Sequence, residues 1–253
     1  MRLPRRLDHG QEVELVGHLE ELRSRLMVAG GAILATTILA FTVHGRVIAL
    51  LTAQLPPNHR QLLTLGVAEP FTTSLKVSIA LGFALALPIV LWQLWSFVAP
   101  AMTPKTQRAI AGFTVFAAAL LVGGAVFGYR VALPAALHFL TNYDNSIYNI
   151  QIRAADFVSF AVLVLAACGA VFELPIVVLG LVRVGALTST KLRKNRKIGY
   201  MIVACIGVAL PGIDPVTTAV ETVPLAILFE ASIWLSLFFE RRWFTSLAPV
   251  DNV

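Results

Sequence analysis

Charged residues are scarce in this 253-residue chain, in which Asp, Glu, Lys and Arg together make up only 13%. A soluble globular domain carries about 25% charged residues. Apolar residues instead make up 57%, and the mean hydropathy is +0.79. This composition excludes an ordinary soluble protein and predicts an integral membrane protein. Because the chain has material for about six spans with short connections, we expect one polytopic membrane domain over residues 1–253.

Cysteine and known catalytic motifs are scarce as well. Cys168 and Cys205 lie within apolar runs and lack the spacing of a metal or redox site. The chain contains no signature of a P-loop, a zinc protease or a serine hydrolase. We therefore expect no enzymatic activity, no catalytic residue, no metal and no cofactor. The first 25 residues are polar and charged, so we also expect no cleavable signal peptide.

Long apolar runs are abundant and predict an all-α protein with six transmembrane helices. The predicted spans lie at about 26–43, 75–98, 109–128, 157–182, 198–210 and 216–239. The fifth run has 13 residues before Pro211. Such a run gives about 20 Å of helix against a hydrocarbon core of about 30 Å, so we expect the last hairpin to be short. Prolines inside the spans favour an open, concave arrangement of helices over a tight bundle.

The distribution of Lys and Arg predicts the orientation of the spans. With six spans, 15 of the 20 basic residues lie on the side that carries both termini. We therefore expect both termini to be cytoplasmic. The basic run from Lys191 to Lys197 is most simply a topology anchor that contacts anionic lipids, and the net charge of +6 requires no nucleic acid.

Acidic residues at membrane depth are the main candidates for function. Glu173 lies in the run 157–181, which is otherwise free of ionisable side chains. Inserting a charge at a helix centre costs about 2.5 to 3.5 kcal/mol, so such a residue indicates function by default. Glu230 lies in the last predicted span and should face protein or water for the same reason. Asp214 lies in the break before that span and is most simply a turn residue that caps the following helix.

The segment before the first span has the pattern of an amphipathic helix. Four leucines repeat at spacings of four, three and four residues: Leu15, Leu19, Leu22 and Leu26. They predict an interfacial helix that leads into the first span. His18, Glu21 and Arg25 project from one flank of this helix. Glu21 and Arg25 form an i, i+4 pair that contributes about 0.3 to 0.5 kcal/mol on an exposed helix, and spacing alone favours this structural role.

Several segments in order resemble one protein family. The string HLEELR at residues 18–23 resembles the HLxELR signature of the TatC family, the multispanning subunit of the twin-arginine protein translocase. Further similar strings are EPF at 69–71, PIVLWQLWSFVAP at 88–100, FELP at 172–175 and PGID at 211–214. The resemblance covers about residues 12 to 240. It implies six spans in the cytoplasmic (inner) membrane and a receptor for folded precursor proteins whose signal peptides carry two adjacent arginines.

The resemblance also implies a signal-peptide site on the cytoplasmic face. Glu21 is its central acid, because a carboxylate pairs with a guanidinium through charge-assisted hydrogen bonds. This reverses the preference for a purely structural role. The other residues of the implied site are Glu20, His18, Arg23, Gln93, Phe97 and Thr106. Gln93 faces either the lipid headgroups or a polar groove. Thr106 stands where the family usually has a glutamate, which should weaken the attraction for a dibasic ligand.

Single-span subunits of the TatA and TatB type are the implied partners, with the lipid bilayer and further copies of the chain in a larger complex. Glu173, Glu230 and Asp214 would be the polar positions for docking such a subunit within the membrane. The alternative function is a secondary transporter or proton-coupled carrier that uses Glu173 and Glu230 as a titrating pair. This alternative explains the intramembrane acids but leaves the HLEELR helix unexplained, and the two halves of the chain show no inverted repeat.

Overall fold

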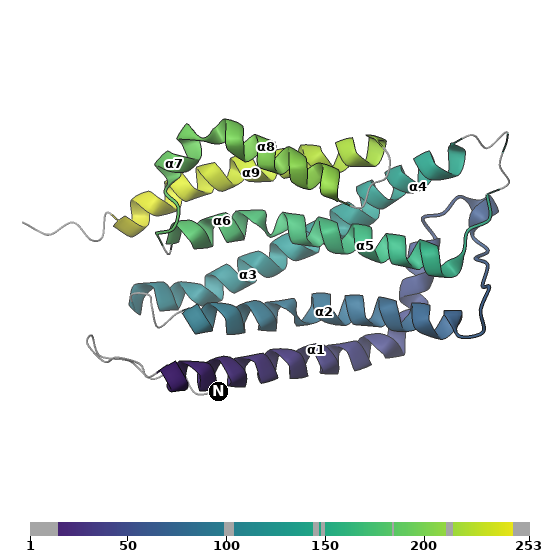
Figure 1. Ribbon diagram of the computed structural model, residues 1–253, viewed down its shortest axis with the longest axis horizontal. Helices are drawn as coiled ribbons and strands as arrows, with labels where there is room; N and C mark the ends of the chain where they lie inside the picture. Colours follow the sequence, from purple (N-terminus) through teal and green to yellow (C-terminus); the bar gives the residue numbers. More distant parts are fainter. Residues whose placement is uncertain are drawn as a thin grey trace, which may run out of the picture. The chain divides into compact units, whose positions relative to one another are not determined.

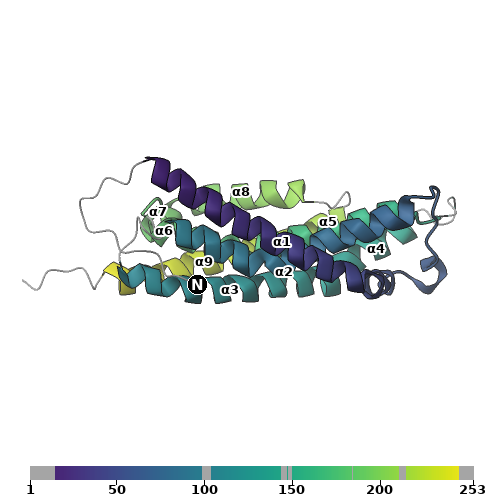
Figure 2. The same cartoon turned by 90° about the horizontal axis from the view of Figure 1, so that it is seen from below.

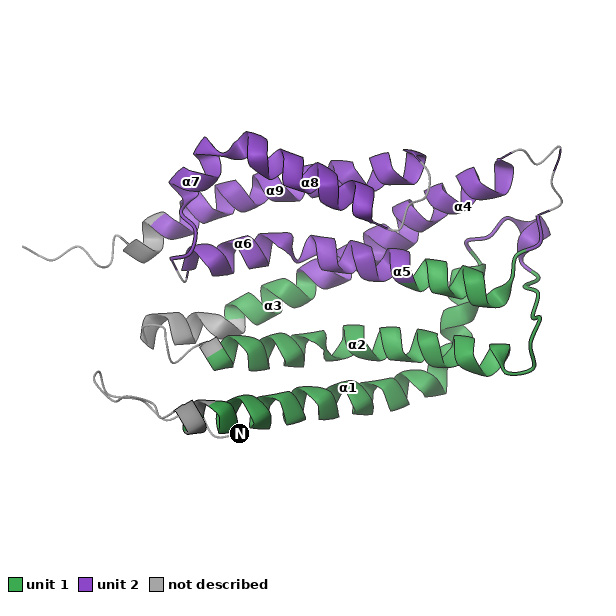
Figure 3. Ribbon diagram, in the orientation of Figure 1, with its two compact units in different colours: residues 1–53, 61–119, 152–162 green, residues 54–60, 120–151, 163–253 purple. Residues whose placement is uncertain are grey.

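In the computed structural model of the chain, residues 15–98, 104–143, 147, 150–183, 185–210 and 215–244 are described. These residues are overwhelmingly helical and form no β-strand; their one isolated β-bridge joins Leu63 to Arg153. The predicted all-α class is therefore confirmed (Figure 1). The chain packs as two compact units, which Figure 3 colours separately. Unit 1 comprises residues 1–53, 61–119 and 152–162, and unit 2 comprises residues 54–60, 120–151 and 163–253.

Unit 1 is built on the first two helices. Helix α1 (Leu15–Thr52) contains both the predicted interfacial helix and the first predicted span as one continuous helix of 38 residues. Helix α2 (Glu69–Val98) runs beside it in both views (Figures 1 and 2). The two backbones approach closely at Gly82, where a Cβ atom would lie 2.5 Å from the Cα atom of Thr37. The hydroxyl of Thr36 donates to the Gly82 carbonyl at 2.7 Å, so both packing and a hydrogen bond fix the pair.

Two helices contribute residues to both units. They are α3 (Pro104–Phe127) and α5 (Ala154–Phe172). The third predicted span ends near residue 128, but the helix continues through a π-helical segment, η3 (Gly128–Ala132), into α4 (Leu133–Asn142). Tyr129 and Arg130 interrupt the apolar run and hide this continuation in the sequence. Pro134 cannot donate a backbone hydrogen bond, and it lies in the first turn of α4, directly after the π-helical segment.

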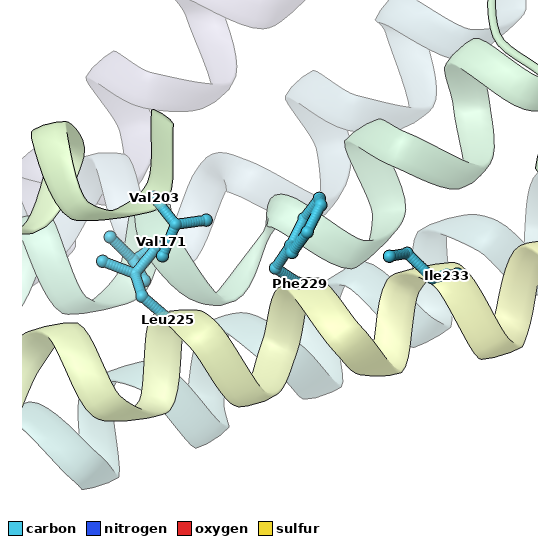
Figure 4. Packing of buried hydrophobic residues seen from close by; sticks show 5 residues of the cluster. All are labelled: Val171, Val203, Leu225, Phe229 and Ile233. Carbon is cyan, nitrogen blue, oxygen red and sulfur yellow. The ribbon is translucent and has the colours of Figure 1, made fainter. Parts of the chain in front are cut away.

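Unit 2 contains the remaining helices: α6 (Leu174–Arg183), α7 (Ser189–Lys194), α8 (Arg196–Ala209) and α9 (Pro215–Phe244). Helices α8 and α9 run antiparallel, because Gly199 faces Phe229 and Gly207 faces Thr222. The missing Cβ atoms of both glycines allow this close contact. The core of the unit is a buried cluster from α5, α8 and α9, shown in Figure 4: Val171, Val203, Leu225, Phe229 and Ile233.

Five helical segments of the described chain are long and apolar enough to cross a membrane. They cover residues 19–52, 69–97, 112–142, 154–183 and 215–240. The fifth predicted span coincides with α8, whose 14 residues make it shorter than these segments. Its length of about 21 Å is less than the hydrocarbon thickness of about 30 Å, as the sequence indicated. The count of six spans and the single polytopic domain stay predictions.

Candidate functional site

Glu21 lies near the start of α1 and binds a guanidinium group from its own helix. Residues four apart on a helix are neighbours, and the Nη2 atom of Arg25 donates to Oε1 of Glu21. The Cζ atom of Arg25 lies 5.7 Å from the centroid of the Phe97 ring on α2, which is cation–π distance. Side-chain exposure is 14% for Arg25 and 33% for Glu21. The structure therefore brings the predicted residues Glu21 and Phe97 together through Arg25.

The other predicted residues of this region are less closely connected. Glu20 and Arg23 are exposed and line a separate shallow depression on α1 with Met27. Gln93 is half-buried on α2. The side chains of His18 and Thr106 lie outside the described part of the structure, as does the whole of Asp214. The sequence pointed to the Glu21–Arg25 pair through its spacing, but no sequence pattern indicates that Phe97 packs against it.

Glu173 lies at the break between α5 and α6. Its carbonyl accepts hydrogen bonds from the backbone N–H groups of Ile176 and Val177, both at 3.0 Å. Pro175 lacks an N–H, so the helix is interrupted at this point. Both carboxylate oxygens of Glu173 are buried, and neither has a hydrogen-bond partner among the described residues. A buried polar group without a partner costs about 1 to 3 kcal/mol, and more when it is charged, so it requires an explanation.

Aromatic and small residues surround this break within unit 2. The ring of Phe172 lies 5.6 Å from that of Phe127, measured between centroids. Gly124 packs so closely that a Cβ atom would lie 2.6 Å from the carbonyl oxygen of Cys168. The backbone before Glu173 therefore packs tightly against α3. This packing fixes the backbone that carries Glu173, and no described residue donates a hydrogen bond to its carboxylate.

Glu230 on α9 has partners on α8. Its carboxylate accepts from Nη2 of Arg196 at 2.8 Å and from the Tyr200 hydroxyl at 3.0 Å. Glu240, further along the same helix, accepts from the Ser189 backbone N–H at 2.8 Å at the start of α7. Two of the three acids of α9, Glu230 and Glu240, thus link the basic segment of α7 and α8 to the last helix. Glu230 is part of a structural contact, and the sequence alone did not identify Arg196 or Tyr200 as its partners.

Glu69 is a buried acid whose partners can be identified only in the folded structure. Only 6% of the residue is exposed at the start of α2. Its carboxylate accepts from the backbone N–H of Leu65 at 3.0 Å, of Ala155 at 3.0 Å and of Gly66 at 3.3 Å. Nε of Arg153 also donates to it at 3.1 Å. Glu69 therefore joins the segment before α2 to the start of α5, beside the bridge of Leu63 and Arg153.

These features define a polytopic all-α membrane protein in which Glu69, Glu230 and Glu240 link separate segments, while the buried carboxylate oxygens of Glu173 have no partner among the described residues. Within the described ranges no group of His, Cys, Asp and Glu has the arrangement of a metal site. Residues 17–224 match the sequence profile of the family described as Sec-independent protein translocase protein (TatC). The chain belongs to the TatC family. It is a subunit of the Sec-independent protein translocase, a transport protein and not an enzyme.

Individual relatives agree over nearly the whole chain. The Sec-independent protein translocase protein TatC of Carboxydothermus hydrogenoformans is 34% identical, over 91% of this chain and 96% of its own. The TatCd protein of Bacillus subtilis is 32% identical, over 92% of this chain and 95% of its own. A crystal structure described as the twin arginine translocase receptor TatC has a TM-score of 0.76 at 32% identity, over 87% of this chain and 99% of that one. The family does not favour the alternative of a secondary transporter.

Proposed function

We propose that this chain is the receptor subunit of the translocase and binds twin-arginine signal peptides through Glu21. One observation carries the proposal: Glu21 and the ring of Phe97 together already hold a guanidinium group, that of Arg25. A carboxylate and an aromatic ring are the two groups that favour arginine over lysine, because guanidinium is planar and stacks. A related solved structure is described as a receptor of the twin-arginine translocase, which supports the same assignment.

The orientation of the chain forms part of the proposal. Fifteen of the 20 basic residues lie on one side of a six-span arrangement, which supports cytoplasmic termini in an inner membrane. In that orientation the start of α1 and the end of α2 meet the cytoplasm, where a precursor first encounters the membrane. The four exposed basic residues of the α7–α8 segment then contact anionic lipid headgroups from the same side. They are Lys191, Arg193, Lys194 and Lys197.

Partner subunits of the single-span TatA and TatB type form the second part of the proposal. Glu173 presents two buried oxygens without partners in the described structure. A polar side chain from a helix that docks in the membrane would supply the missing hydrogen bond. The same argument does not apply to Glu230, because Arg196 and Tyr200 occupy its carboxylate. We infer that Glu173, and not Glu230, is the docking position, and that a larger complex assembles around several copies of the chain.

Peptide binding by the purified full-length chain in detergent tests the receptor assignment. A labelled signal peptide with Arg-Arg should bind more tightly than its Lys-Lys variant. Glu21→Gln should weaken binding of the Arg-Arg peptide by about 1.5 to 3 kcal/mol, because a charge-assisted hydrogen bond is lost. Asp156→Asn removes the same charge from the first turn of α5 and serves as the matched control. Equal binding by Glu21→Gln and the unaltered chain would refute the role of Glu21.

A further inference from the structure

Arg25 occupies the position where a signal arginine would bind. Its Nη2 atom holds Oε1 of Glu21, and its guanidinium lies over the Phe97 ring. With a side-chain exposure of 14%, it is the more deeply buried partner of the pair. An incoming arginine that is to use the same carboxylate oxygen and the same ring face must first replace Arg25. The receptor assignment alone does not require this competition.

The fit of Arg25 in this position is incomplete. Its Nη1 atom is buried and has no hydrogen-bond acceptor among the described residues. A buried donor without an acceptor is unfavourable, whereas water would satisfy the same donor outside. Arg25 lies one helix turn after Glu21, and rotation about the bonds of its long side chain can move the guanidinium off the ring without any change in the backbone. The contact is therefore suited to exchange.

We propose that Arg25 is an internal competitor that occupies the arginine site of the resting chain and thereby lowers its affinity for every cationic signal peptide. The proposal rests on the receptor function proposed above. A guanidinium can replace Arg25 in both contacts, at the carboxylate and on the ring face. A lysine ammonium is a strongly hydrated point charge without a planar face, so its own contacts with the carboxylate and the ring are weaker. The cost of displacing Arg25 is the same for either ligand, so the competition lowers both affinities by the same factor.

This proposal differs in its consequences from a role of Arg25 in holding Glu21 in place. If Arg25 competes, its removal leaves a free carboxylate that attracts any cation. Both peptides then bind more tightly by the same factor, because the side chain that they no longer displace is the same for both. If Arg25 only positions Glu21, its removal weakens the binding of both peptides.

The test measures the affinities of the Arg-Arg and Lys-Lys peptides for the full-length chain and for Arg25→Gln. We expect Arg25→Gln to tighten the binding of both peptides by about two- to fivefold, the range of a partly exposed ion pair. Arg25→Lys keeps a competing cation that cannot stack on the ring in the same way, so it should tighten binding by less than Arg25→Gln. Arg193→Gln removes an exposed charge from α7 and controls for the change in net charge. Monodisperse elution of each variant in detergent verifies folding.

The double variant Glu21→Gln/Arg25→Gln separates the two proposals. If Arg25 acts through Glu21, the double variant binds like Glu21→Gln alone. Unchanged or weaker Arg-Arg binding by Arg25→Gln overturns the competitor and leaves the receptor assignment intact. If Glu21→Gln binds like the unaltered chain, both proposals are overturned. If Arg25→Gln fails to fold, the same comparison is made with Arg25→Lys, where an Arg-Arg affinity no higher than that of the unaltered chain overturns the competitor.

Discussion

Glu69 and Glu173 are two buried acids with opposite surroundings. Three backbone N–H groups and one guanidinium donate to the carboxylate of Glu69. The oxygens of Glu173 are buried as well, yet nothing in the described structure donates to them. Burial alone therefore does not distinguish an acid that stabilises the fold from one that we propose to dock a partner. The number of hydrogen bonds that each carboxylate accepts does distinguish them, because burying a carboxylate without a donor does not stabilise a fold.

The position of each acid along its helix explains this difference. Glu69 is the first residue of α2, and it reaches both the preceding turn and the start of α5, where unpaired N–H groups are available. Glu173 lies at an interruption between α5 and α6. The backbone N–H groups at this interruption donate to backbone carbonyls, and Pro175 has no N–H. Helix starts provide donors for a carboxylate, and a break caused by proline does not.

Removal of Glu69 should have the largest effect on folding. Glu69→Ala leaves four donors without their acceptor and should lower the free energy of unfolding by about 2 to 4 kcal/mol, since water replaces only part of the loss. Glu69→Gln keeps one acceptor oxygen and should lose less. Chemical denaturation of the purified chain in detergent measures both values, with the exposed Glu20→Ala as the control. If Glu69→Ala unfolded at the same denaturant concentration as the unaltered chain, the hydrogen bonds of Glu69 would not stabilise the fold, and the contrast with Glu173 would be wrong.

Removal of Glu173 should spare the fold and affect assembly. Glu173→Ala deletes two unpaired oxygens, so the stability of the isolated chain should not fall. Association with single-span subunits should weaken by about 1 to 2 kcal/mol, the strength of such hydrogen bonds in membranes. Glu173→Gln retains a polar group at the same depth and should preserve most association and precursor export. Co-purification and export assays measure both.

A titrating role for Glu173 makes the opposite prediction for the amide variant. A proton carrier would lose its function in Glu173→Gln as completely as in Glu173→Ala, because neither side chain titrates. Normal assembly with abolished export in Glu173→Gln would therefore contradict the docking role.

Glu230 is an intermediate case and should show the smallest effect. It has two partners, but 28% of its side chain and 37% of that of Arg196 are exposed. Glu230→Gln should lower the free energy of unfolding by about 0.5 to 1 kcal/mol, because solvent screens the ion pair. A double-mutant cycle with Arg196→Gln in the same denaturation experiment measures the coupling. A loss of unfolding free energy as large as that of Glu69→Ala would show that solvent exposure does not determine how much the acid contributes to stability.

Much of this architecture follows from local patterns in the sequence. Apolar runs longer than 18 residues predict helices that cross a membrane, and four of the five candidate segments contain a predicted run almost unchanged. The cost of a charge in hydrocarbon singles out Glu173 from its position in an apolar run. Spacing of four residues predicted the contact of Glu21 with Arg25. The motifs at residues 18–23 and 172–175 indicated the family.

Contacts between distant segments were decided by the tertiary structure alone. Glu69 and Arg153 are separated by 84 residues, and no periodicity relates them. Glu173 and Glu230 carry the same sequence signal, an acid in an apolar run, yet only Glu230 meets an arginine and a tyrosine. The placement of Phe97 against Arg25 depends on the close approach of α1 to α2 at Gly82. A pattern within one helix reports the cost of burying a group, but the partner that offsets this cost comes from another helix, and only packing determines which one.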